Sequence, residues 1–572
     1  MLLRRLGWAL LFDKTSAADA EVVARMQMAA AIGAGLWILH PLFVSTTLYV
    51  VQREAMLPAT FTLLGLLLWL AGRERFRSDR PLSGLVLITA GLVGCTILAT
   101  LSKANGALLP LLVLIIEACL LRRLAPLPAP RNYTRAMLLL AALPATAILF
   151  YLAYVGWTGL TQGISDIRPW SLGQRLLTEP RVLMEYLRQL WLPRPFSSGL
   201  FNDQVEASTS LLQPASTLLS ICTVAGLFIG AWLARKRFPL TSTAILFFFA
   251  GHLLESSTIA LELQFEHRNY LPSILLFWPF AAWLCGFRTP PSHFIPSSHL
   301  VLKGGLAIAL LSGLALMTHA RASLWGDPQS QALLWAEINP RSPRAQANAA
   351  STEVAAQRPD LAIDRLKSAL VDSPNEIQLS LGLLTAQCAT GQLDTETLDA
   401  AANALATTRN SGGLLSNWFV RAIESSSRPT CPQLSLKAIE NLVLAAGSNP
   451  YLQNRPGSLQ DLQHLHGRIE LARDNAGTAL SHFNDALHQQ VRIGLALQQA
   501  ALLGATGYPE LGLDHLHHYE SISEQEIIPE LGMPRLHSKV MRKQGYWNRE
   551  LETLRKTLLE DCITKERAKN GH

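Results

Sequence analysis

The stretch "GLVLITAGLVGCTILATLSKANGALLPLLVLIIEACLL", residues 84–121, decides the class of the fold. It holds two apolar runs, and only Lys103 and Glu117 carry a charge along it. A helix needs about 20 mostly apolar residues to cross the hydrocarbon core of a bilayer. The stretch therefore predicts two membrane-spanning helices, over 83–101 and 104–121, which are joined by a short polar turn at Lys103.

The same alternation of apolar runs and polar loops extends on both sides of this pair. It predicts seven further spans, over 29–48, 56–72, 136–156, 214–234, 240–260, 270–287 and 303–319. The composition agrees, because 49% of the 572 residues are hydrophobic, 16% are charged and the mean hydropathy is +0.22. A chain of this size is too apolar for an ordinary soluble enzyme.

Basic residues give this helix bundle an orientation. The net charge is +7 and the pI is about 9.1, but the lysines and arginines are dispersed along short loops, so they predict no nucleic-acid partner. Three such loops, 73–82, 122–135 and 235–237, are rich in basic residues. Basic loops stay in the cytoplasm. We therefore expect the turns near Arg53 and Lys103, the loops 157–213 and 265–273, and everything after about 320, on the opposite side.

Two segments of this half are not predicted to cross the membrane. Residues 1–28 contain a short apolar stretch without a cleavage pattern, so we expect a cytoplasmic N-terminal segment and no signal peptide. In the loop 157–213, apolar residues recur at helical spacing around Leu183 and Tyr186, which predicts a helix on the membrane surface.

After His319 the pattern changes to soluble, alanine-rich amphipathic helices. Small and large residues recur at the offsets of tetratricopeptide repeats: Ala362, Leu366, Ala369 and Pro374; Gly467, Ala479, Phe483 and Ala486; Gly512 and Leu516. Small residues let paired helices approach closely, and stacked pairs bury a continuous core. The pattern predicts a tetratricopeptide-type α-solenoid over 320–572, with a generic helical bundle as the alternative. The pattern weakens over 390–455, where 425–433 and 447–458 are predicted breaks.

The seven cysteines show no metal-ligand spacing. Cys95, Cys119, Cys222 and Cys285 lie in apolar runs, and Cys388, Cys431 and Cys562 are far apart along the chain. The sequence therefore predicts neither a zinc site nor a disulfide framework.

Charged residues at the ends of the predicted spans are the candidate functional groups. The stretch "FEHRNYLPS", residues 265–273, places Glu266, His267 and Arg268 side by side before an apolar run. Ionisable residues are costly at membrane depth, so these side chains should lie at the interface or line a wet cavity. Arginine and histidine there can hold a lipid-linked phosphate, and Glu266 can act as a base. The alternatives are a salt bridge and interfacial snorkelling.

Two more polar turns are predicted on the same side of the membrane. The first contains Arg53 and Glu54, and the second contains Lys103 and Asn105. Converging at one surface, they would complete a basic site for an anionic headgroup. Each turn read alone is equally consistent with a helix cap.

Three motifs in this order resemble a known family. The segment "LHPLFVSTTLYVVQREAMLPATFTLLGLLLWL" (39–70), the turn "LSKANG" (101–106) and "FEHRNYLPS" are similar to segments of the TMTC-type protein O-mannosyltransferases and their bacterial relatives. Those proteins have a membrane glycosyltransferase domain of the C class followed by tetratricopeptide repeats. The resemblance covers about residues 35–290 and, in kind, the repeat region.

The resemblance implies a function and a place for it. It implies a donor sugar on a polyprenyl phosphate, transfer to a protein or glycan acceptor, and a multi-pass protein of the bacterial inner membrane with its C-terminal domain in the periplasm. The expected donor-binding residues are Arg53, Lys103, His267, Arg268, Asn269 and Tyr270. A protein partner is expected at the repeats. In the family, an acidic residue of the first external loop activates the acceptor or coordinates a divalent metal.

The sequence also departs from the family pattern. It begins at what matches the end of the second span, so the span and acidic loop that normally precede it are expected to be missing. Glu54 and Glu266 are then the leading candidates for a catalytic carboxylate, with Asp166 and Asp203 on the same side. A non-catalytic, membrane-anchored repeat scaffold is the main alternative function. A transporter is a weaker alternative, because no inverted repeat of broken spans is evident.

Three histidine motifs have structural interpretations. His40-Pro41 predicts a kink with a hydrogen-bonded imidazole. His252 and Glu255, one helical turn apart, predict a structural pair. The run 515–518, "HLHH", predicts a solvated helix surface and no metal site, because only His515 and His518 share a face.

Overall fold

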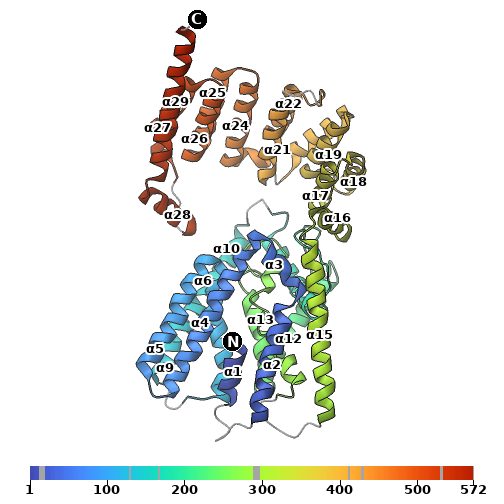
Figure 1. Cartoon of the computed structure of the whole chain (residues 1–572), viewed down its shortest axis with the longest axis vertical. Coiled ribbons are helices and arrows are strands. Elements are labelled where there is room, and N and C mark those ends of the chain that lie inside the picture. The colour runs from blue at the N-terminus through green and yellow to red at the C-terminus, as the bar shows by residue number, and fades with distance from the viewer. Residues whose placement is uncertain are drawn as a thin grey trace. The chain divides into compact units, whose positions relative to one another are not determined.

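The chain folds into two compact helical units. A computed structural model describes residues 1–11, 20–127, 131–164, 168–287, 297–409, 412–426, 431–527 and 532–570. Within these ranges the regular structure is helical, apart from an isolated bridge between Ser210 and Gln213. The membrane unit comprises Met1–Asn339 and the C-terminal unit Pro340–His572 (Figure 1). The prediction of an all-α fold is confirmed.

The membrane unit consists of α-helices joined or interrupted by short 3-10 and π-helical segments. Its α-helices are α1 (Leu2–Leu11), α2 (Ala20–Ile38), α3 (Val44–Leu48), α4 (Met56–Arg77), α5 (Pro81–Thr89), α6 (Thr96–Ser102), α7 (Leu109–Ile116), α8 (Arg122–Leu124), α9 (Arg131–Met137), α10 (Leu143–Thr161), α11 (Leu172–Trp191), α12 (Ser216–Ala234), α13 (Pro239–His252), α14 (Trp278–Leu284), α15 (Ser297–Leu324) and α16 (Pro328–Ile338). The turns are η1 (Pro41–Phe43), η2 (Val50–Ala55), η3 (Ala90–Cys95), η4 (Ala104–Leu108), η5 (Glu117–Leu121), η6 (Leu138–Ala142) and η7 (Glu266–Asn269).

Six continuous helical segments in the described ranges are long and apolar enough to cross a membrane. They are Val50–Arg77, Pro81–Ser102, Ala104–Leu121, Arg131–Thr161, Ser216–Ala234 and Val301–Leu324. A seventh is obtained if Ala20–Ile38 and Pro41–Leu48, which meet at a bend of 50°, count as one span. The chain is therefore a membrane protein, with six or seven such segments where the sequence predicts nine.

The difference lies in the segments 240–260 and 270–287. They contain only the shorter helices α13 and α14, with turns and extended chain between them. Phe247 and Leu275 are fully buried and Trp278 is 1% exposed, so these apolar residues pack against protein. Irregular backbone is tolerated at membrane depth only where protein covers it and satisfies its polar groups. Hydropathy alone does not distinguish a residue facing lipid from one facing protein.

Arg175 of α11 satisfies the irregular chain that follows α13. Its guanidinium is fully buried and donates hydrogen bonds to the carbonyl oxygens of Glu255 (2.6 Å), Ser257 (3.0 Å) and Leu261. Glu179, one turn further along α11, pairs with it at 2.7 Å. The sequence predicted the helix α11 from its apolar periodicity, but not this polar face.

The bend at His40-Pro41 confirms the predicted kink. His40 precedes η1; its Nδ1 accepts a hydrogen bond from the Leu42 backbone N–H (3.2 Å), and its Nε2 lies 3.0 Å from the Leu190 carbonyl oxygen. Both ring nitrogens therefore have partners. The imidazole ties the bend to the end of α11.

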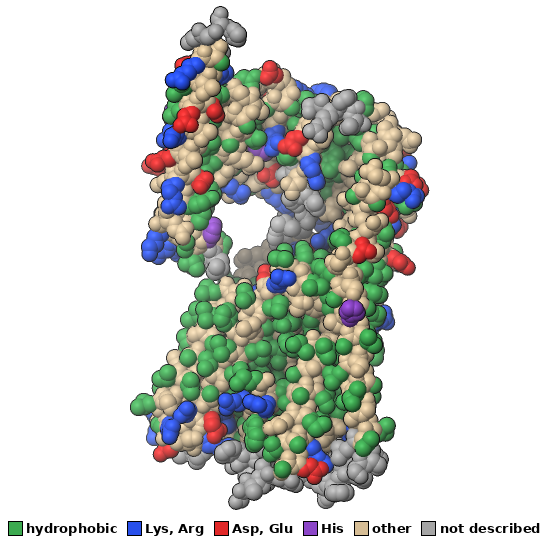
Figure 2. Space-filling model, in the orientation of Figure 1, with side chains coloured by type: hydrophobic (Ala, Val, Ile, Leu, Met, Phe, Trp, Pro, Cys, Tyr) green, Lys and Arg blue, Asp and Glu red, His purple; other side chains and the backbone are tan. Residues whose placement is uncertain are grey.

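The three basic loops lie at one end of the membrane unit. Arg73 of α4 pairs with Glu117 at 3.0 Å, and the Tyr133 hydroxyl of α9 donates to the same carboxylate. Ala231, near the end of α12, packs on Cys119. The ends of these helices are thus neighbours, and Figure 2 shows Lys and Arg side chains gathered below a broad apolar surface. Because α4 runs from Met56 to Arg77, the turn at Glu54 lies at the opposite end.

The C-terminal unit is a succession of packed helices. They are α17 (Pro343–Ala355), α18 (Pro359–Asp372), α19 (Ile377–Thr390), α20 (Thr395–Thr407), α21 (Gly412–Ser425), α22 (Leu436–Gly447), α23 (Pro450–Gln453), α24 (Pro456–Ala472), α25 (Ala476–Gln489), α26 (Ile493–Ala505), α27 (Pro509–Ile522), α28 (Gly532–Lys543) and α29 (Tyr546–Asn570), with the turn η8 (Ser523–Gln525). Most neighbouring helices in this order pack on each other, and α20 also packs on α22 and α27 on α29.

Small and large residues alternate across the contacts between these helices. A Cβ atom on Gly467 would overlap the ring of Phe483, and one on Gly512 would lie 2.9 Å from the Ala500 carbonyl oxygen. The glycines therefore let α24 and α25, and α26 and α27, approach closely. Leu366, like Phe483, is fully buried. Ala362, Ala479, Ala486 and Leu516 are fully buried as well, whereas Pro374 is exposed.

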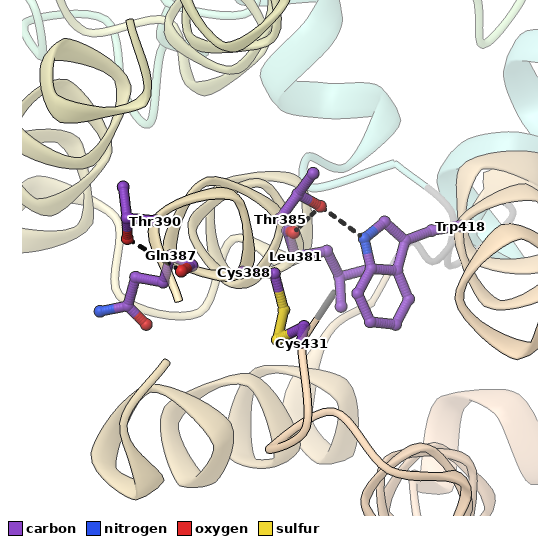
Figure 3. Close-up of a disulfide and its surroundings, with 7 residues drawn as sticks. All are labelled: Leu381, Thr385, Gln387, Cys388, Thr390, Trp418 and Cys431. Atoms are coloured by element: carbon purple, nitrogen blue, oxygen red, sulfur yellow. Dashed lines mark hydrogen bonds between the residues drawn. A yellow bond between two sulfur atoms is a disulfide. The ribbon is translucent and has the colours of Figure 1, made fainter. Parts of the chain in front are cut away.

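A disulfide joins Cys388 of α19 to Cys431, which lies ahead of α22 (Figure 3). The two Cα atoms are 5.1 Å apart, although 43 residues separate them along the chain. The Trp418 indole N–H donates to Thr385 Oγ1 (3.0 Å) beside it. The prediction of no disulfide is wrong for this pair, because separation along the chain does not measure distance between packed helices.

A polar network with a buried centre joins the four helices α24 to α27 of the same unit. Gln499 of α26 is fully buried; its Nε2 lies 3.3 Å from Nδ1 of His464, and its Oε1 lies 3.0 Å from Nε2 of His515. His515 is also fully buried, and its Nδ1 contacts Oδ1 of Asn484 at 2.7 Å. The prediction of a solvated surface at 515–518 is therefore wrong for His515.

Candidate functional site

Lys103 organises a cluster of charged side chains at the end of the membrane unit opposite the basic loops. The Lys103 ammonium lies 2.9 Å from Glu255 Oε1 and 3.5 Å from Glu54 Oε1. The Asn105 amide donates to Glu255 Oε2 at 3.5 Å. The two turns that the sequence singled out, at Arg53 and at Lys103, therefore converge, and the chain after α13 adds a carboxylate. We call these four residues the Lys103 cluster.

The two carboxylates of the Lys103 cluster differ in access. The side chain of Glu255 is 3% exposed and that of Glu54 is 51% exposed. Glu255 was not predicted as a site residue; its sequence signal was a lone acidic residue after an apolar run. Within the described ranges it makes no hydrogen bond to His252, so it pairs with Lys103 and not with the predicted histidine.

Glu266 is held in a buried ion pair. It is 1% exposed, and its Oε2 accepts from Arg321 of α15 at 2.6 Å and from the Ser45 hydroxyl at 3.1 Å. The Ser197 hydroxyl donates to Oε1. Both oxygens are engaged by three distant segments, so Glu266 ties η7 to its surroundings. Of the two leading carboxylates, Glu54 is the one with room to accept a proton from a substrate.

His267 and Arg268 are the two other ionisable residues of η7. Burial, Lys103 and Arg268 together lower the pKa of His267 to about 2, so the imidazole is neutral at pH 7. Its Nδ1 is buried and has no hydrogen-bond partner among the described residues. His267 therefore supplies a neutral donor or acceptor to this site, whereas Lys103 and Arg268 supply the charge.

Arg268 has unused hydrogen-bonding capacity. Within the described part of the chain it makes one hydrogen bond, from Nη1 to the Leu263 carbonyl (3.0 Å), and no carboxylate lies within 4 Å of it. Its guanidinium stacks over the Phe265 ring at 5.4 Å and is 3% exposed. A guanidinium that lacks a carboxylate partner is suited to bind a phosphate.

The remaining predicted binding residues are placed differently. Asn269 is fully buried and donates to the Glu266 carbonyl at 3.2 Å. The Tyr270 ring packs against Trp37, with ring centres 4.8 Å apart. Arg53 is exposed, and its Nε donates to the Thr47 carbonyl at 2.8 Å. The structure thus places His267 within electrostatic reach of both Lys103 and Arg268, while Asn269 and Tyr270 pack η7 into the interior.

Two further acidic residues from the sequence do not join the cluster. Asp203 is an exposed residue of the chain between α11 and α12. Asp166 lies outside the described residues.

An apolar surface borders the Lys103 cluster. Val50 and Val51 of η2 are 71% and 62% exposed, and Leu57 and Leu101 are also exposed. These residues flank Glu54 and Lys103 in sequence. In a bilayer such a surface is covered by lipid tails, so a lipid-borne headgroup has a path to the cluster.

The Lys103 cluster does not fit a divalent metal ion. Within the described ranges, no three His, Cys, Asp or Glu side chains lie close enough together to hold one. Glu54 and Glu255 both contact the ammonium of Lys103, which offsets one of their two negative charges. Hard divalent ions need several oxygen ligands in a closed arrangement.

Comparisons of the chain with models of protein families, with curated proteins and with solved structures give no match.

Proposed function

We propose that this protein binds the anionic headgroup of a lipid-linked sugar at the Lys103 cluster and Arg268, and that it transfers the sugar to a protein or glycan acceptor. One observation carries the proposal: Arg268 lacks a carboxylate partner, and its neighbour His267 is within electrostatic reach of Lys103, whose turn is bordered by exposed apolar residues. The motif resemblance to polyprenyl-phosphate-dependent glycosyltransferases supplies the chemical class of the donor.

Two independent features favour an external location for this site. The three basic loops lie at the other end of the membrane unit, and such loops stay in the cytoplasm. The disulfide in the C-terminal unit favours an oxidising compartment. The last residue of the membrane unit, Asn339, donates to the Ser198 carbonyl at 3.0 Å and thus lies on the side of the loop after α11. Together with the resemblance, these features support a bacterial inner-membrane protein with a periplasmic C-terminal unit.

The C-terminal unit is proposed to be a tetratricopeptide-type array that recruits a protein partner. Its paired helices and the close contacts at Gly467 and Gly512 support this assignment. Stacked helical pairs present a concave face that suits an extended peptide. In this proposal the array brings an acceptor or an assembly partner to the membrane.

The chemistry of the transfer uses few protein groups. The bond between the anomeric carbon and the phosphate oxygen breaks, the acceptor hydroxyl oxygen bonds to that carbon, and the phosphate leaves with the electron pair. Lys103 and Arg268 stabilise the charge that grows on the phosphate. Glu54, the half-exposed carboxylate, takes the proton of the acceptor hydroxyl.

A membrane-anchored scaffold without catalysis is the second candidate. It is favoured by the ion pair of Glu266 with Arg321 and by the two carboxylates that already neutralise Lys103. Both contacts are what a purely structural role would produce. The scaffold and the enzyme differ in donor binding and in turnover.

Binding of a polyprenyl phosphate to the full chain in nanodiscs tests the proposal first. Arg268→Ala should weaken binding about tenfold or more, because a charge-assisted hydrogen bond is lost. Lys303→Ala removes a positive charge from a half-buried position on α15, where the ammonium donates to the Trp283 carbonyl, and serves as the control. Equal binding by Arg268→Ala and by the unchanged protein would refute the site.

Turnover separates the two functions. With polyprenyl-phosphate sugars as donors, the unchanged chain should release polyprenyl phosphate, and Glu54→Gln should bind the donor but turn it over at least about 100-fold more slowly. Donor binding without turnover by the unchanged chain would favour the scaffold.

A further inference from the structure

A second candidate site lies in the membrane unit, apart from the Lys103 cluster. It is a cavity of about 260 Å³ between α11, the chain 192–205 and the C-terminal part of α15. Ser197 and Arg321, which hold the Glu266 carboxylate, line it. None of Lys103, His267 or Arg268 lines it. The cavity therefore lies on the side of η7 that carries the Glu266 side chain, and the Lys103 cluster lies near His267 of the same turn.

The wall of this cavity contains amide groups that are only half satisfied. Gln189 Nε2 donates to Glu185 at 2.9 Å, which leaves Gln189 Oε1 buried without a partner in the described structure. Ser198 Oγ donates to Asn202 Oδ1 at 2.7 Å, which leaves Asn202 Nδ2 in the same condition. Buried polar atoms without partners are rare because they are costly. Both residues line the cavity, although these two atoms have no accessible surface in the present side-chain conformations.

Gln264 adds a third amide to the lining. It is 7% exposed, lines the cavity, and makes no hydrogen bond to any residue that the structure describes. An amide offers two donors and an acceptor side by side. Neighbouring hydroxyl groups on a ring can both donate to and accept from such a group, whereas an apolar ligand cannot.

Among the charged residues around the cavity, one arginine is not balanced by a carboxylate. Arg188 pairs with Glu185 at 2.6 Å, and Arg321 pairs with Glu266 at 2.6 Å. Arg194 also lines the cavity and has no ion-pair partner within the described ranges. A ligand with one negative charge would complete the balance.

We propose that this cavity binds a sugar that carries one anionic group. In this proposal the amide groups form hydrogen bonds with the sugar hydroxyls, and Arg194 forms an ion pair with the anionic group. Apolar side chains such as Phe196 and Leu192 contact the C–H face of the ring. The volume lies just below the usual range of small-molecule pockets, roughly 300–1,000 Å³, and therefore suits a small saccharide. The assignment as a sugar site stands on the cavity alone and does not rest on the proposed function.

Saturation-transfer NMR on the full chain in nanodiscs tests this inference. The probes are glucose, glucuronic acid and glucose 6-phosphate, which share a ring and differ in charge. We expect all three to bind, with at least one acidic sugar binding about tenfold more tightly than glucose, and the better acidic probe identifies a carboxylate or a phosphate source. Arg194→Ala should abolish that preference, and Gln264→Leu should weaken all three. Lys303→Ala, on α15 and outside the cavity lining, should change neither.

Two outcomes would overturn the inference. The first is the absence of a saturation-transfer signal from all three sugars. The second is a loss of sugar binding in Lys103→Ala together with full binding in Arg194→Ala and Gln264→Leu, because the sugar would then sit at the Lys103 cluster. If Arg268→Ala fails to affect polyprenyl phosphate while Arg194→Ala abolishes the acid preference, the proposed donor site fails and the sugar cavity stands.

Discussion

The two units bury polar side chains in opposite ways. In the membrane unit, the described residues include seven buried Arg and Glu side chains: Arg73, Arg175, Glu179, Glu255, Glu266, Arg268 and Arg321. In the described part of the C-terminal unit only Glu353 is of this kind, and the other buried polar residues are uncharged, as in the network around Gln499.

The difference follows from what surrounds each unit. A charged side chain on a helix in a bilayer cannot reach water along most of its length, so it turns inward and needs a partner. A charge on a water-exposed helix stays at the surface at little cost, as in the exposed pair of Arg358 and Asp360. Buried charges in the membrane unit therefore hold irregular chain in place, and buried amides and imidazoles hold helices in the C-terminal unit.

Breaking one ion pair in the membrane unit should have the largest effect. Arg321→Met leaves Glu266 buried without its partner, and we expect a loss of about 3–5 kcal/mol in the free energy of unfolding. Adding Glu266→Gln removes the stranded charge; its Oε1 can accept from one of the hydroxyls of Ser45 and Ser197 and its Nε2 can donate to the other, so the double variant should recover at least half of the loss. Unfolding of both variants in detergent measures this. Equal stability of the single and double variants would show that charge burial is not the cost.

Removing the disulfide should have the next largest effect, and only in the C-terminal unit. Cys388→Ser opens a loop of 43 residues, and we expect a loss of about 2–4 kcal/mol. Hydrogen exchange of peptides from α19 to α22 in the full chain measures it. Cys562→Ser, at a free cysteine, is the matched control. Unchanged protection in Cys388→Ser would contradict the expected cross-link.

Acid should weaken the C-terminal unit through its buried network. Burial lowers the pKa of His464 to about 4 and that of His515 to about 3. Below about pH 6.5 the unfolded chain takes up protons that the folded unit does not, so stability falls between pH 6.5 and about 4. We expect a loss on the order of 2 kcal/mol. Hydrogen exchange of α24 to α27 measures it, and His515→Gln should make the dependence shallower.

Two glycine substitutions should give the smallest effects, with opposite signs. Gly467→Ala places a methyl group against the buried ring of Phe483, and we expect a net loss of about 1–2 kcal/mol from overpacking. Gly382→Ala meets Leu366 at 3.5 Å, an ordinary contact, and should gain about 0.5–1 kcal/mol from helix propensity. Thermal unfolding of both variants measures the difference. The same sign for both would refute close packing at Gly467.

Sequence patterns predicted the helices well where one physical cause dominates. Long apolar runs marked the span at 104–121 and the others that the structure contains. They failed at 240–260 and 270–287, because the residues there are apolar to pack on protein, as Trp278 shows. Hydropathy measures the free energy of transferring a side chain out of water, and it does not distinguish a lipid environment from a protein interior.

The candidate site was predicted in part for a similar reason. Lys103, Glu54 and Arg268 were identifiable because a charge next to an apolar run is conspicuous. Their partners were not: Arg321 is 55 residues from Glu266, and Ser45 is 221 residues from it. Pairing at such separations depends on how the helices pack, which no local pattern encodes. The half-satisfied amides of the sugar cavity were hidden for the same reason.

The disulfide between Cys388 and Cys431 also provides a second covalent connection across the middle of the C-terminal unit, beside the polypeptide backbone. A protease that cuts once between these two residues would sever the polypeptide without separating its halves. Such a nicked molecule would migrate as one species in a non-reducing gel and as two fragments once the thiols are reduced. After a single cut in this stretch, the helices beyond Cys431 would therefore remain covalently attached to the membrane unit.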